Sequence, residues 1–263
     1  MTLMLDHSPS LVEVLRGNRG NRPPSDRRVA SGVRSMIEDG IYEVLSARPA
    51  TPIVVRASSL RQSFVATELS SSALSRLRGV LVNQVLRLLS VAMIVDDPFR
   101  DALAAWRAQG STGALGEAFE LMNADDRARL ETDVNAHCVT LRRALGDVPQ
   151  GWLPRSSVRA VQHLAGGDVV ARDVVDLMVG TVNRDVASVA LFDVTTAPLS
   201  EGSERAMRFH ALVQTLRTST MPLRTAAFST ATGELWTQDV DFALLARSVD
   251  EVLSFVAEHA LPQ

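Results

Sequence analysis

The chain has 263 residues, of which 46% are hydrophobic and 22% are charged, a composition that supports one sizeable globular domain. Its formal net charge is −3 and its pI is about 6.0, whereas dedicated nucleic-acid-binding proteins are clearly basic. The single cysteine, Cys138, excludes an intramolecular disulfide and a cysteine-based metal site. No apolar run is long and charge-free enough to span a membrane, and the first residues lack the pattern of a signal peptide, so we expect a cytoplasmic protein.

The N-terminal part of the chain is predicted to be an arm followed by a helix and a short strand. Residues 1–26 include the run GNRGNRPPSD, whose glycines and prolines indicate a mobile arm. Residues 27–47 repeat apolar side chains every three or four positions, which predicts an amphipathic helix. Prolines end this helix, and residues 53–55 are expected to form a short strand. We expect residues 27–263 to form a single domain.

A helical block is predicted at about residues 71–147, inside that domain. Asn123 is a typical N-cap residue for the longest helix of the block. His137 lies on the same helix, and we interpret it as a structural residue because the neighbouring sequence offers it no metal-binding partners. The helices expected in the block are residues 71–92, 99–109, 115–122 and 125–145.

Two strands with alternating apolar residues are expected at residues 167–180 and 187–196. Each carries one aspartate near its far end, Asp176 on the first strand and Asp193 on the second, among apolar neighbours where an unpaired carboxylate is costly to bury. Two acids at strand ends beside a helix form the skeleton of a metal site for phosphodiester hydrolysis, which would take Mg or Mn. The elements expected to follow are a helix at residues 201–218, a strand at 225–229 and a last helix at 241–259.

These segments resemble nucleases of the PD-(D/E)XK superfamily, of the actinobacterial RecB-like type. The run VDLMVG at residues 175–180 resembles the segment that carries the first acid of the family, and DVT at residues 193–195 stands where the family has an acid, an apolar residue and a lysine. The most specific match is RFHALVQTLRT at residues 208–218. The resemblance implies an α/β, restriction-endonuclease-like fold with a mixed central sheet flanked by helices and a helical insertion. It also implies a Mg or Mn site at Asp176 and Asp193.

Several positions of the family's active site are altered in this chain. The lysine of the family, which activates water and stabilises charge on the phosphate, is replaced by Thr195, and the chain contains no lysine at all. An arginine could supply the positive charge only if Arg205 or Arg208 reached the site from the following helix. The other altered positions are Asn83 in place of a histidine, Ser157 in place of a glutamate, Ala206 in place of an acid and His210 in place of a tyrosine.

Two functions follow as hypotheses. The first is an active Mg- or Mn-dependent DNA exonuclease or endonuclease that uses Asp176 and Asp193, with Thr195 or Asp173 as substitute residues. The second is a catalytically impaired protein with the nuclease fold, a pseudoenzyme that binds DNA or a protein partner in DNA metabolism and holds Mg or Mn weakly. Because the loss of a single transition-state donor costs about a hundredfold or more in rate, the altered positions favour the second hypothesis.

Overall fold

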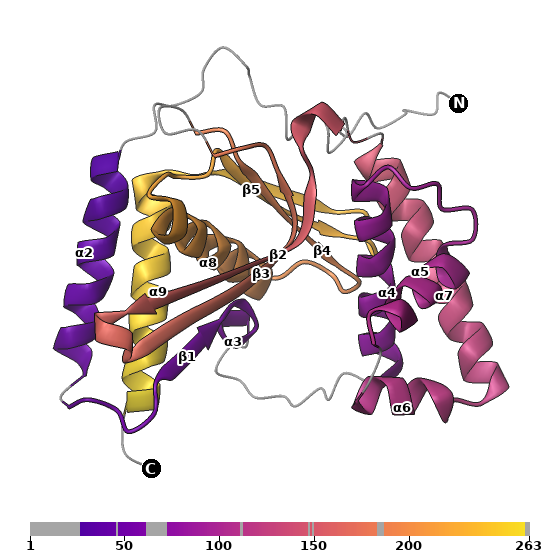
Figure 1. Ribbon diagram of the computed structural model, residues 1–263, viewed down its shortest axis with the longest axis horizontal. Coiled ribbons are helices and arrows are strands. Elements are labelled where there is room, and N and C mark those ends of the chain that lie inside the picture. Colours follow the sequence, from indigo (N-terminus) through magenta and orange to yellow (C-terminus); the bar gives the residue numbers. More distant parts are fainter. Residues whose placement is uncertain are drawn as a thin grey trace, which may run out of the picture.

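The computed structural model describes residues 27–45, 47–61, 73–110, 113–146, 148, 150–182 and 187–260. These residues form a mixed six-stranded sheet with eight α-helices around it (Figure 1). The prediction of an α/β fold with a mixed central sheet flanked by helices is therefore confirmed. The arm predicted at residues 1–26 lies outside the described residues.

The sheet is built around its longest strand, β3 (Val169–Val179). On one edge, β3 pairs along most of its length with the antiparallel β2. On the other edge, β1 pairs in parallel with residues 169–172 and β4 pairs antiparallel with residues 177–179. The middle of β3 therefore has no paired strand on that edge among the described residues. The other strands are β1 (Ile53–Arg56), β2 (Arg155–Leu164), β4 (Ala190–Thr195), β5 (Arg224–Ser229) and β6 (Leu235–Asp239), in the order β1-β3-β4-β5-β6.

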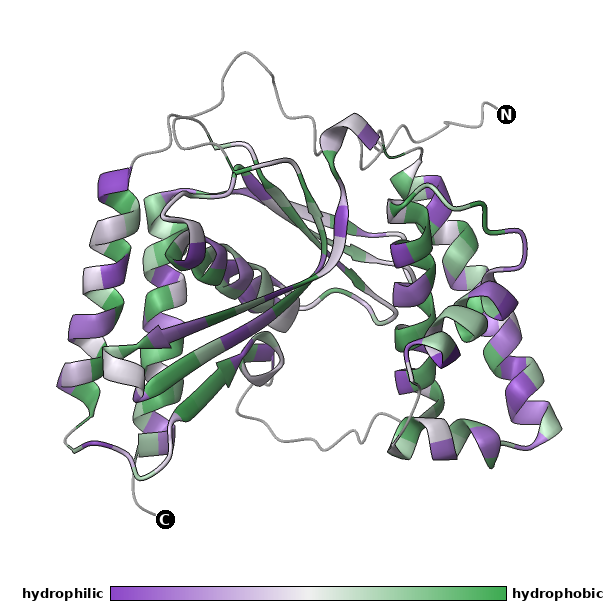
Figure 2. Cartoon of the chain, in the orientation of Figure 1, coloured by the Kyte–Doolittle hydropathy of each residue, from purple (hydrophilic) through white to green (hydrophobic). Residues whose placement is uncertain are grey.

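One face of the sheet is covered by a layer of three helices, α2 (Arg27–Val44), α8 (Glu201–Thr218) and α9 (Phe242–Ala260). The buried residues of α2 and α9 are mainly apolar (Figure 2), whereas α8 also buries polar side chains such as Arg208 and His210. Buried residues of α2, α8 and α9 pack with β1 and β3 in one apolar cluster that includes Ile37, Phe209 and Val249. Because α8 lies between the sheet and the outer helices, all of its residues from position 206 to 216 are buried.

The predicted helical block is present and packs on the other face of the sheet, at the β4 and β5 end. Its apolar residues form a cluster with Phe192 of β4 and Phe228 of β5. Asn123 caps the longest helix as expected, because its side-chain oxygen accepts a hydrogen bond of 2.8 Å from the backbone N–H of Asp126. The block consists of α4 (Ala73–Ser90), α5 (Pro98–Ala108), α6 (Ala114–Glu120) and α7 (Ala124–Leu145).

Three short helical segments complete the described fold: α3 (Ala57–Arg61) and the 3₁₀ turns Gln150–Trp152 and Ala165–Gly167. Helix α3 follows β1 directly and packs against the first turn of α8. A Cβ atom at Gly202 of α8 would clash with the backbone carbonyl of Arg61, so glycine at this position permits the close approach of the two helices. This packing fixes the end of α3 beside the unpaired middle of β3.

Candidate functional site

Asp176 of β3 and Asp193 of β4 lie side by side at the centre of the sheet. In the antiparallel ladder between the strands, Leu177 is paired with Phe192, and the two aspartates are the next residue beyond this pair on each strand. Each carboxyl group perturbs the pKa of the other, as expected for direct neighbours. Asp193 is only 6% exposed, and Asp176 is partly buried.

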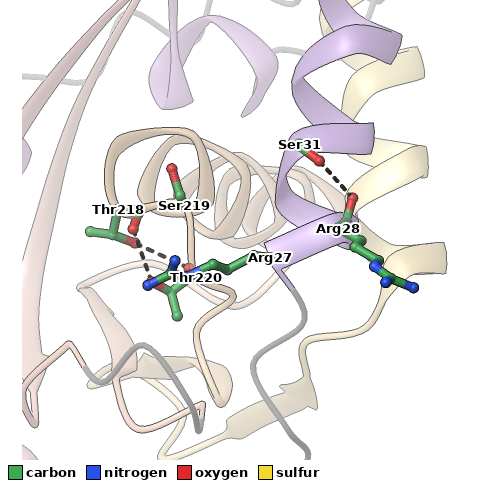
Figure 3. A pocket seen from close by; sticks show the side chains of 6 residues that line it. All are labelled: Arg27, Arg28, Ser31, Thr218, Ser219 and Thr220. Carbon is green, nitrogen blue, oxygen red and sulfur yellow. Dashed lines mark hydrogen bonds between the residues drawn. The ribbon is translucent and has the colours of Figure 1, made fainter.

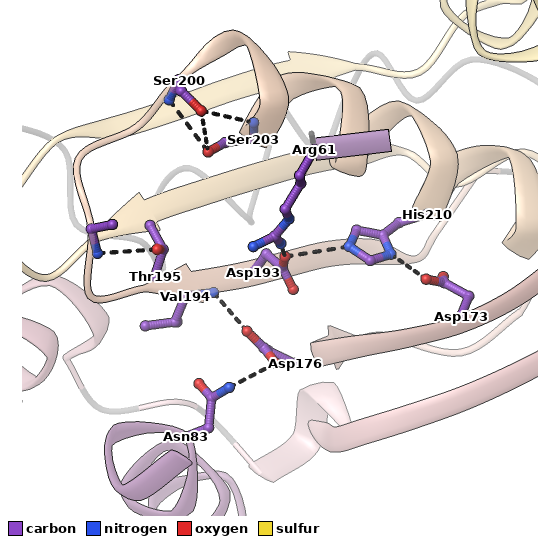
Figure 4. A network of polar contacts seen from close by, with 11 residues as sticks. Arg61, Asn83, Asp173, Asp176, Asp193, Val194, Thr195, Ser200, Ser203 and His210 are labelled. Carbon is purple, nitrogen blue, oxygen red and sulfur yellow. Dashed lines mark hydrogen bonds and ion pairs between the residues drawn. The ribbon is translucent and has the colours of Figure 1, made fainter. Parts of the chain in front are cut away.

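Both oxygens of the Asp176 carboxyl group accept hydrogen bonds (Figure 4). The Asn83 amide of α4 donates to Oδ1 at 3.1 Å, and the backbone N–H of Val194 donates to Oδ2 at 2.9 Å. The helical block therefore contributes Asn83 to the site. The backbone of β4 holds the other oxygen at the point where the β3–β4 ladder ends.

Asp193 is bound by two cationic side chains at the same oxygen. Nη2 of Arg61, the last residue of α3, forms an ion pair with Oδ2, and Nε2 of His210 lies 3.3 Å from that oxygen. On its other side, the His210 ring contacts Oδ1 of Asp173 through Nδ1 at 2.7 Å. Figure 4 shows the row that results, from Arg61 through Asp193 and His210 to Asp173. His210 is 1% exposed and Asp173 is 5% exposed, so the Asp193–His210–Asp173 part of this row lies in the core beneath the sheet.

The charges of this row determine the protonation states of its members. Burial alone would lower the pKa of His210, but the carboxylates of Asp173 and Asp193 outweigh it and raise the pKa to about 10. Burial alone would raise the pKa of Asp193, but His210 and Arg61 lower it below the usual range of a carboxyl group. Burial and the adjacent Asp193 carboxylate raise the pKa of Asp176 well above its usual value. At neutral pH the row therefore contains an imidazolium ion between two aspartates, and Asp176 is the carboxyl group that most readily keeps a proton.

A cavity of about 440 Å³ opens beside these acids. Its lining carries four arginines and His210 against three aspartates, which makes it basic in a protein that is acidic overall. Arg56, Arg159 and Arg172 come from three neighbouring strands and are exposed, and within the described residues their side chains form no ion pair. Val161 and Val174, which are 47% and 50% exposed, lie among them.

The residues selected from the sequence divide into those that meet at the cavity and those that do not. Asn83, Asp173, Asp176, Asp193 and His210 all line it. The lining does not include Thr195, Ser157 or Ala206.

Thr195 accepts a hydrogen bond of 3.1 Å from the backbone N–H of Ala197, in the turn that leaves β4 (Figure 4). Ser157 has an exposed side chain and a φ of +51°, although its backbone lies beside Asp176 in the ladder with β2. Ala206 is fully buried within α8. The hydroxyl of Thr195 is therefore engaged in a local turn rather than directed at the two aspartates.

The sequence alone did not indicate Arg61. Helix α3 has only five residues, ASSLR, and Arg61 is 132 positions away from Asp193, so no local pattern indicates their contact. Arg205 and Arg208 were the arginines that could supply positive charge in place of the family's lysine. They pair instead with Glu201 at 3.4 Å and Glu251 at 2.6 Å. The positive charge beside the aspartates thus comes from a different element.

His137 has a structural partner, because its Nδ1 lies 2.8 Å from the Thr230 hydroxyl.

These donors do not fit a tightly held divalent ion as they are arranged. Both Asp176 oxygens accept hydrogen bonds, and Asp193 Oδ2 is shared by two cationic groups. Across the described parts of the chain, no group of three His, Cys, Asp or Glu side chains has the geometry to hold a metal ion. Mg and Mn ions take oxygen ligands, and the positive charges of Arg61 and His210 beside Asp193 would repel either metal ion.

A second cavity, of about 600 Å³, lies between the start of α2 and the end of α8 (Figure 3). It is lined by Arg27, Arg28 and hydroxyl groups, and none of the candidate site residues Asn83, Asp176, Asp193, Thr195 and His210 lies in it. The Thr218 and Thr220 hydroxyls each donate to a nearby backbone carbonyl, which accounts for their positions.

Comparisons with known proteins identify no family for this chain. No family model and no curated protein matches it. Among solved structures, the chain is similar to SSO0001, with 10% sequence identity, a TM-score of 0.32 and coverage of 84% of each chain, a score too low to bear on function. No helix in the described ranges is long and apolar enough to cross a membrane.

Proposed function

We propose that this chain is a DNA-binding protein with a degenerate PD-(D/E)XK-like nuclease site, and that it binds DNA without efficient cleavage. The observation that carries the proposal is the state of Asp193, whose Oδ2 is bound by both Arg61 and His210. An arginine guanidinium is permanently protonated and cannot act as a base, so Arg61 provides charge without the proton transfer that a lysine could provide.

The acids of the site are poorly suited to metal-dependent hydrolysis. A divalent ion at Oδ2 of Asp193 would compete with Arg61 and His210, and it would meet an Asp176 carboxyl group whose raised pKa favours the protonated form. Thr195 carries no positive charge and is hydrogen-bonded within its own turn. Each of these features removes part of the electrostatic stabilisation that phosphoryl transfer requires.

The rim of the cavity nevertheless suits a phosphate backbone. Arg56 of β1 is paired in register with Arg172 of β3, and Arg159 extends the row on β2. Arginine binds phosphate oxygens with a fork of N–H donors, and such contacts supply most of the sequence-independent affinity for nucleic acids. The exposed Val161 and Val174 between them offer apolar contact to sugars or bases.

The test of DNA binding is fluorescence anisotropy with labelled single- and double-stranded oligonucleotides, in a buffer with EDTA. A variant that combines Arg56→Ala, Arg159→Ala and Arg172→Ala should bind more weakly, and the slope of log K against log salt should fall by about 2 to 3 for duplex DNA. The matched control combines Arg100→Ala, Arg129→Ala and Arg143→Ala, which removes the same charge from exposed positions outside the cavity. The control should bind as the wild type does. Absence of binding to either form of DNA would contradict the proposal and favour a protein partner.

Cleavage is tested separately, with Mg or Mn added to the same oligonucleotides. We expect little or no cleavage by the wild type. Robust cleavage that disappears in Asp193→Ala would show that the alternative, an active Mg- or Mn-dependent nuclease, is correct. Cleavage that persists in Asp193→Ala would point to a contaminating enzyme or a different site.

A further inference from the structure

The two cations beside Asp193, His210 and Arg61, differ in how exposed they are to solvent. His210 is 1% exposed and is held from both sides by carboxylates. The Arg61 side chain is 40% exposed and reaches Asp193 from the rim of the cavity. Arg61 is therefore the cation that stands between the solvent-filled cavity and the two aspartates.

From this placement we infer that Arg61 is a built-in counter-ion that takes the carboxylate oxygen a divalent ion would need, and so keeps Mg and Mn out of the site. The inference deepens the proposed function, since it rests on the same loss of efficient cleavage and names the residue responsible for excluding the metal. Its chemistry is competition: Arg61 and His210 already bind Oδ2 of Asp193, and both would repel a hydrated divalent ion that approached this oxygen.

The position of Arg61 is set by the backbone around it. Helix α3 leaves β1 at Arg56, whose register with Arg172 of β3 fixes the start of the helix. The end of α3 is fixed by the close approach of the Arg61 carbonyl to Gly202. Helix α3 is short and is fixed at both its start and its end. The backbone of Arg61 is therefore held at a position from which its guanidinium reaches Asp193.

Substitutes for Arg61 are not available nearby. Arg205 and Arg208 of α8 are bound by Glu201 and Glu251. Arg56, Arg159 and Arg172 line the cavity, but within the described residues none forms an ion pair with an aspartate of the site. Loss of the Arg61 charge therefore leaves Asp176 and Asp193 adjacent with His210 alone to offset them. An under-compensated pair of carboxylates attracts a divalent ion, which needs few protein ligands when it keeps its water molecules.

The experiment is isothermal titration calorimetry of the full chain with Mn²⁺. The variant Arg61→Gln removes the charge and leaves a shorter, neutral amide, and Arg61→Ala provides a second test if Arg61→Gln folds poorly by circular dichroism. We expect weak binding to the wild type. Both variants should gain affinity for one Mn²⁺ per chain by about ten- to a hundredfold, the size expected when one competing charge is removed near a protein surface.

Two controls make the result specific. The double variant Arg61→Gln/Asp193→Asn should lose the gained affinity, because it removes the ligand that Arg61 had covered. The variant Arg56→Gln removes one positive charge from the same cavity at a side chain that contacts no aspartate of the site, and it should gain little. These titrations contain no DNA, so they are independent of the anisotropy test of DNA binding.

The outcomes that overturn the inference are equally direct. Folded Arg61→Gln that binds Mn²⁺ no better than the wild type would show that Arg61 does not exclude the metal. Equal gains in affinity for Mn²⁺ in Arg61→Gln and Arg56→Gln would show that the net charge of the cavity, and not the contact between Arg61 and Asp193, excludes the metal. Tight binding of Mn²⁺ by the wild type, lost in Asp193→Asn, would show that the site accepts a metal with Arg61 in place.

Discussion

At the scale of single residues, the site is defined by how each buried charge is offset. Asp173 and Asp193 flank His210, and Arg61 approaches Asp193 from the cavity. Buried ions are stable only when paired and hydrogen-bonded, and removal of one partner leaves the other uncompensated. The row of alternating charges therefore explains why aspartates and a histidine lie at positions that are otherwise surrounded by apolar side chains.

The protonated state of His210 predicts how the stability of the protein depends on pH. Its pKa is raised to about 10 from the ordinary value of 6.5, so the bound proton stabilises the folded state. This contribution is fully present below about pH 6.5 and is lost as the pH rises through about 10. Between pH 6.5 and 10 we expect the free energy of unfolding of the wild type to fall by roughly 2–4 kcal/mol.

Urea unfolding at pH 6, 8 and 10, followed by circular dichroism, measures this loss. The variant His210→Gln should be less stable at pH 6 and should show a much flatter dependence above that pH. His137, whose pKa is lowered by burial and by Arg78, and Cys138, whose pKa is raised to about 12 by burial, contribute alike to the wild type and the variant, so the difference between the two curves isolates His210. Parallel curves for the wild type and the variant would contradict the assignment of an imidazolium ion at position 210.

At the scale of secondary-structure elements, the packing of α3 on α8 depends on Gly202. Alanine is favoured over glycine inside a helix by about 1 kcal/mol, so Gly202→Ala would stabilise α8 if packing did not matter. Its Cβ would instead clash with the Arg61 carbonyl, which is backbone and cannot rotate away. We expect a net destabilisation of about 1–3 kcal/mol, measured by urea unfolding.

The matched control for that substitution is Gly32→Ala on α2. Gly32 is exposed and has no atom within 4 Å of the position of its missing Cβ. The Gly32→Ala variant should gain about 0.5–1 kcal/mol of stability from helix propensity alone. Stabilisation by both substitutions would mean that α3 does not pack against α8 in the way described.

The elements that could be predicted from the sequence are those whose signal is local. Helix α8 has the predicted bounds, 201 to 218, and its cap at Ser200 is a local hydrogen-bonding motif. Strands β3 and β4 were predicted from strict alternation of apolar residues, which also placed Asp176 and Asp193 near each other. Strand β2, with the sequence RSSVRAVQHL, alternates weakly, and α3 is too short to show a period.

The part of the site that could not be predicted depends on tertiary contacts. Asn83 reaches Asp176 across 93 positions, and Arg61 reaches Asp193 across 132. The resemblance to the nuclease family implies that Asn83 and His210 are altered site positions, and both line the cavity. It does not predict Arg61, because the resemblance places the cation at position 195.

At the scale of the whole molecule, the charges are distributed unevenly. The chain carries a net charge of −3, yet one cavity on the open part of the sheet gathers four arginines. That cavity lies where the helical block, the sheet and α3 meet, since Asn83, Asp176 and Arg61 all line it. An acidic surface with a local basic groove restricts binding of a polyanion to that groove and makes it sensitive to salt.

The same distribution explains why introducing the motif residues of the nuclease family should not by itself produce a nuclease. The variant Asn83→His/Ser157→Glu/Thr195→Lys rebuilds three altered positions, yet Ser157 and Thr195 do not line the cavity and Arg61 still binds Asp193. We expect this variant to show no Mg-dependent nicking of supercoiled plasmid above that of the wild type. Adding Arg61→Gln should introduce Mn²⁺ binding, and any gain in nicking should appear only in that fourfold variant. A triple variant that retains Arg61 and cleaves with Mg²⁺ would show that the motif residues, and not the cation on α3, limit catalysis in this fold.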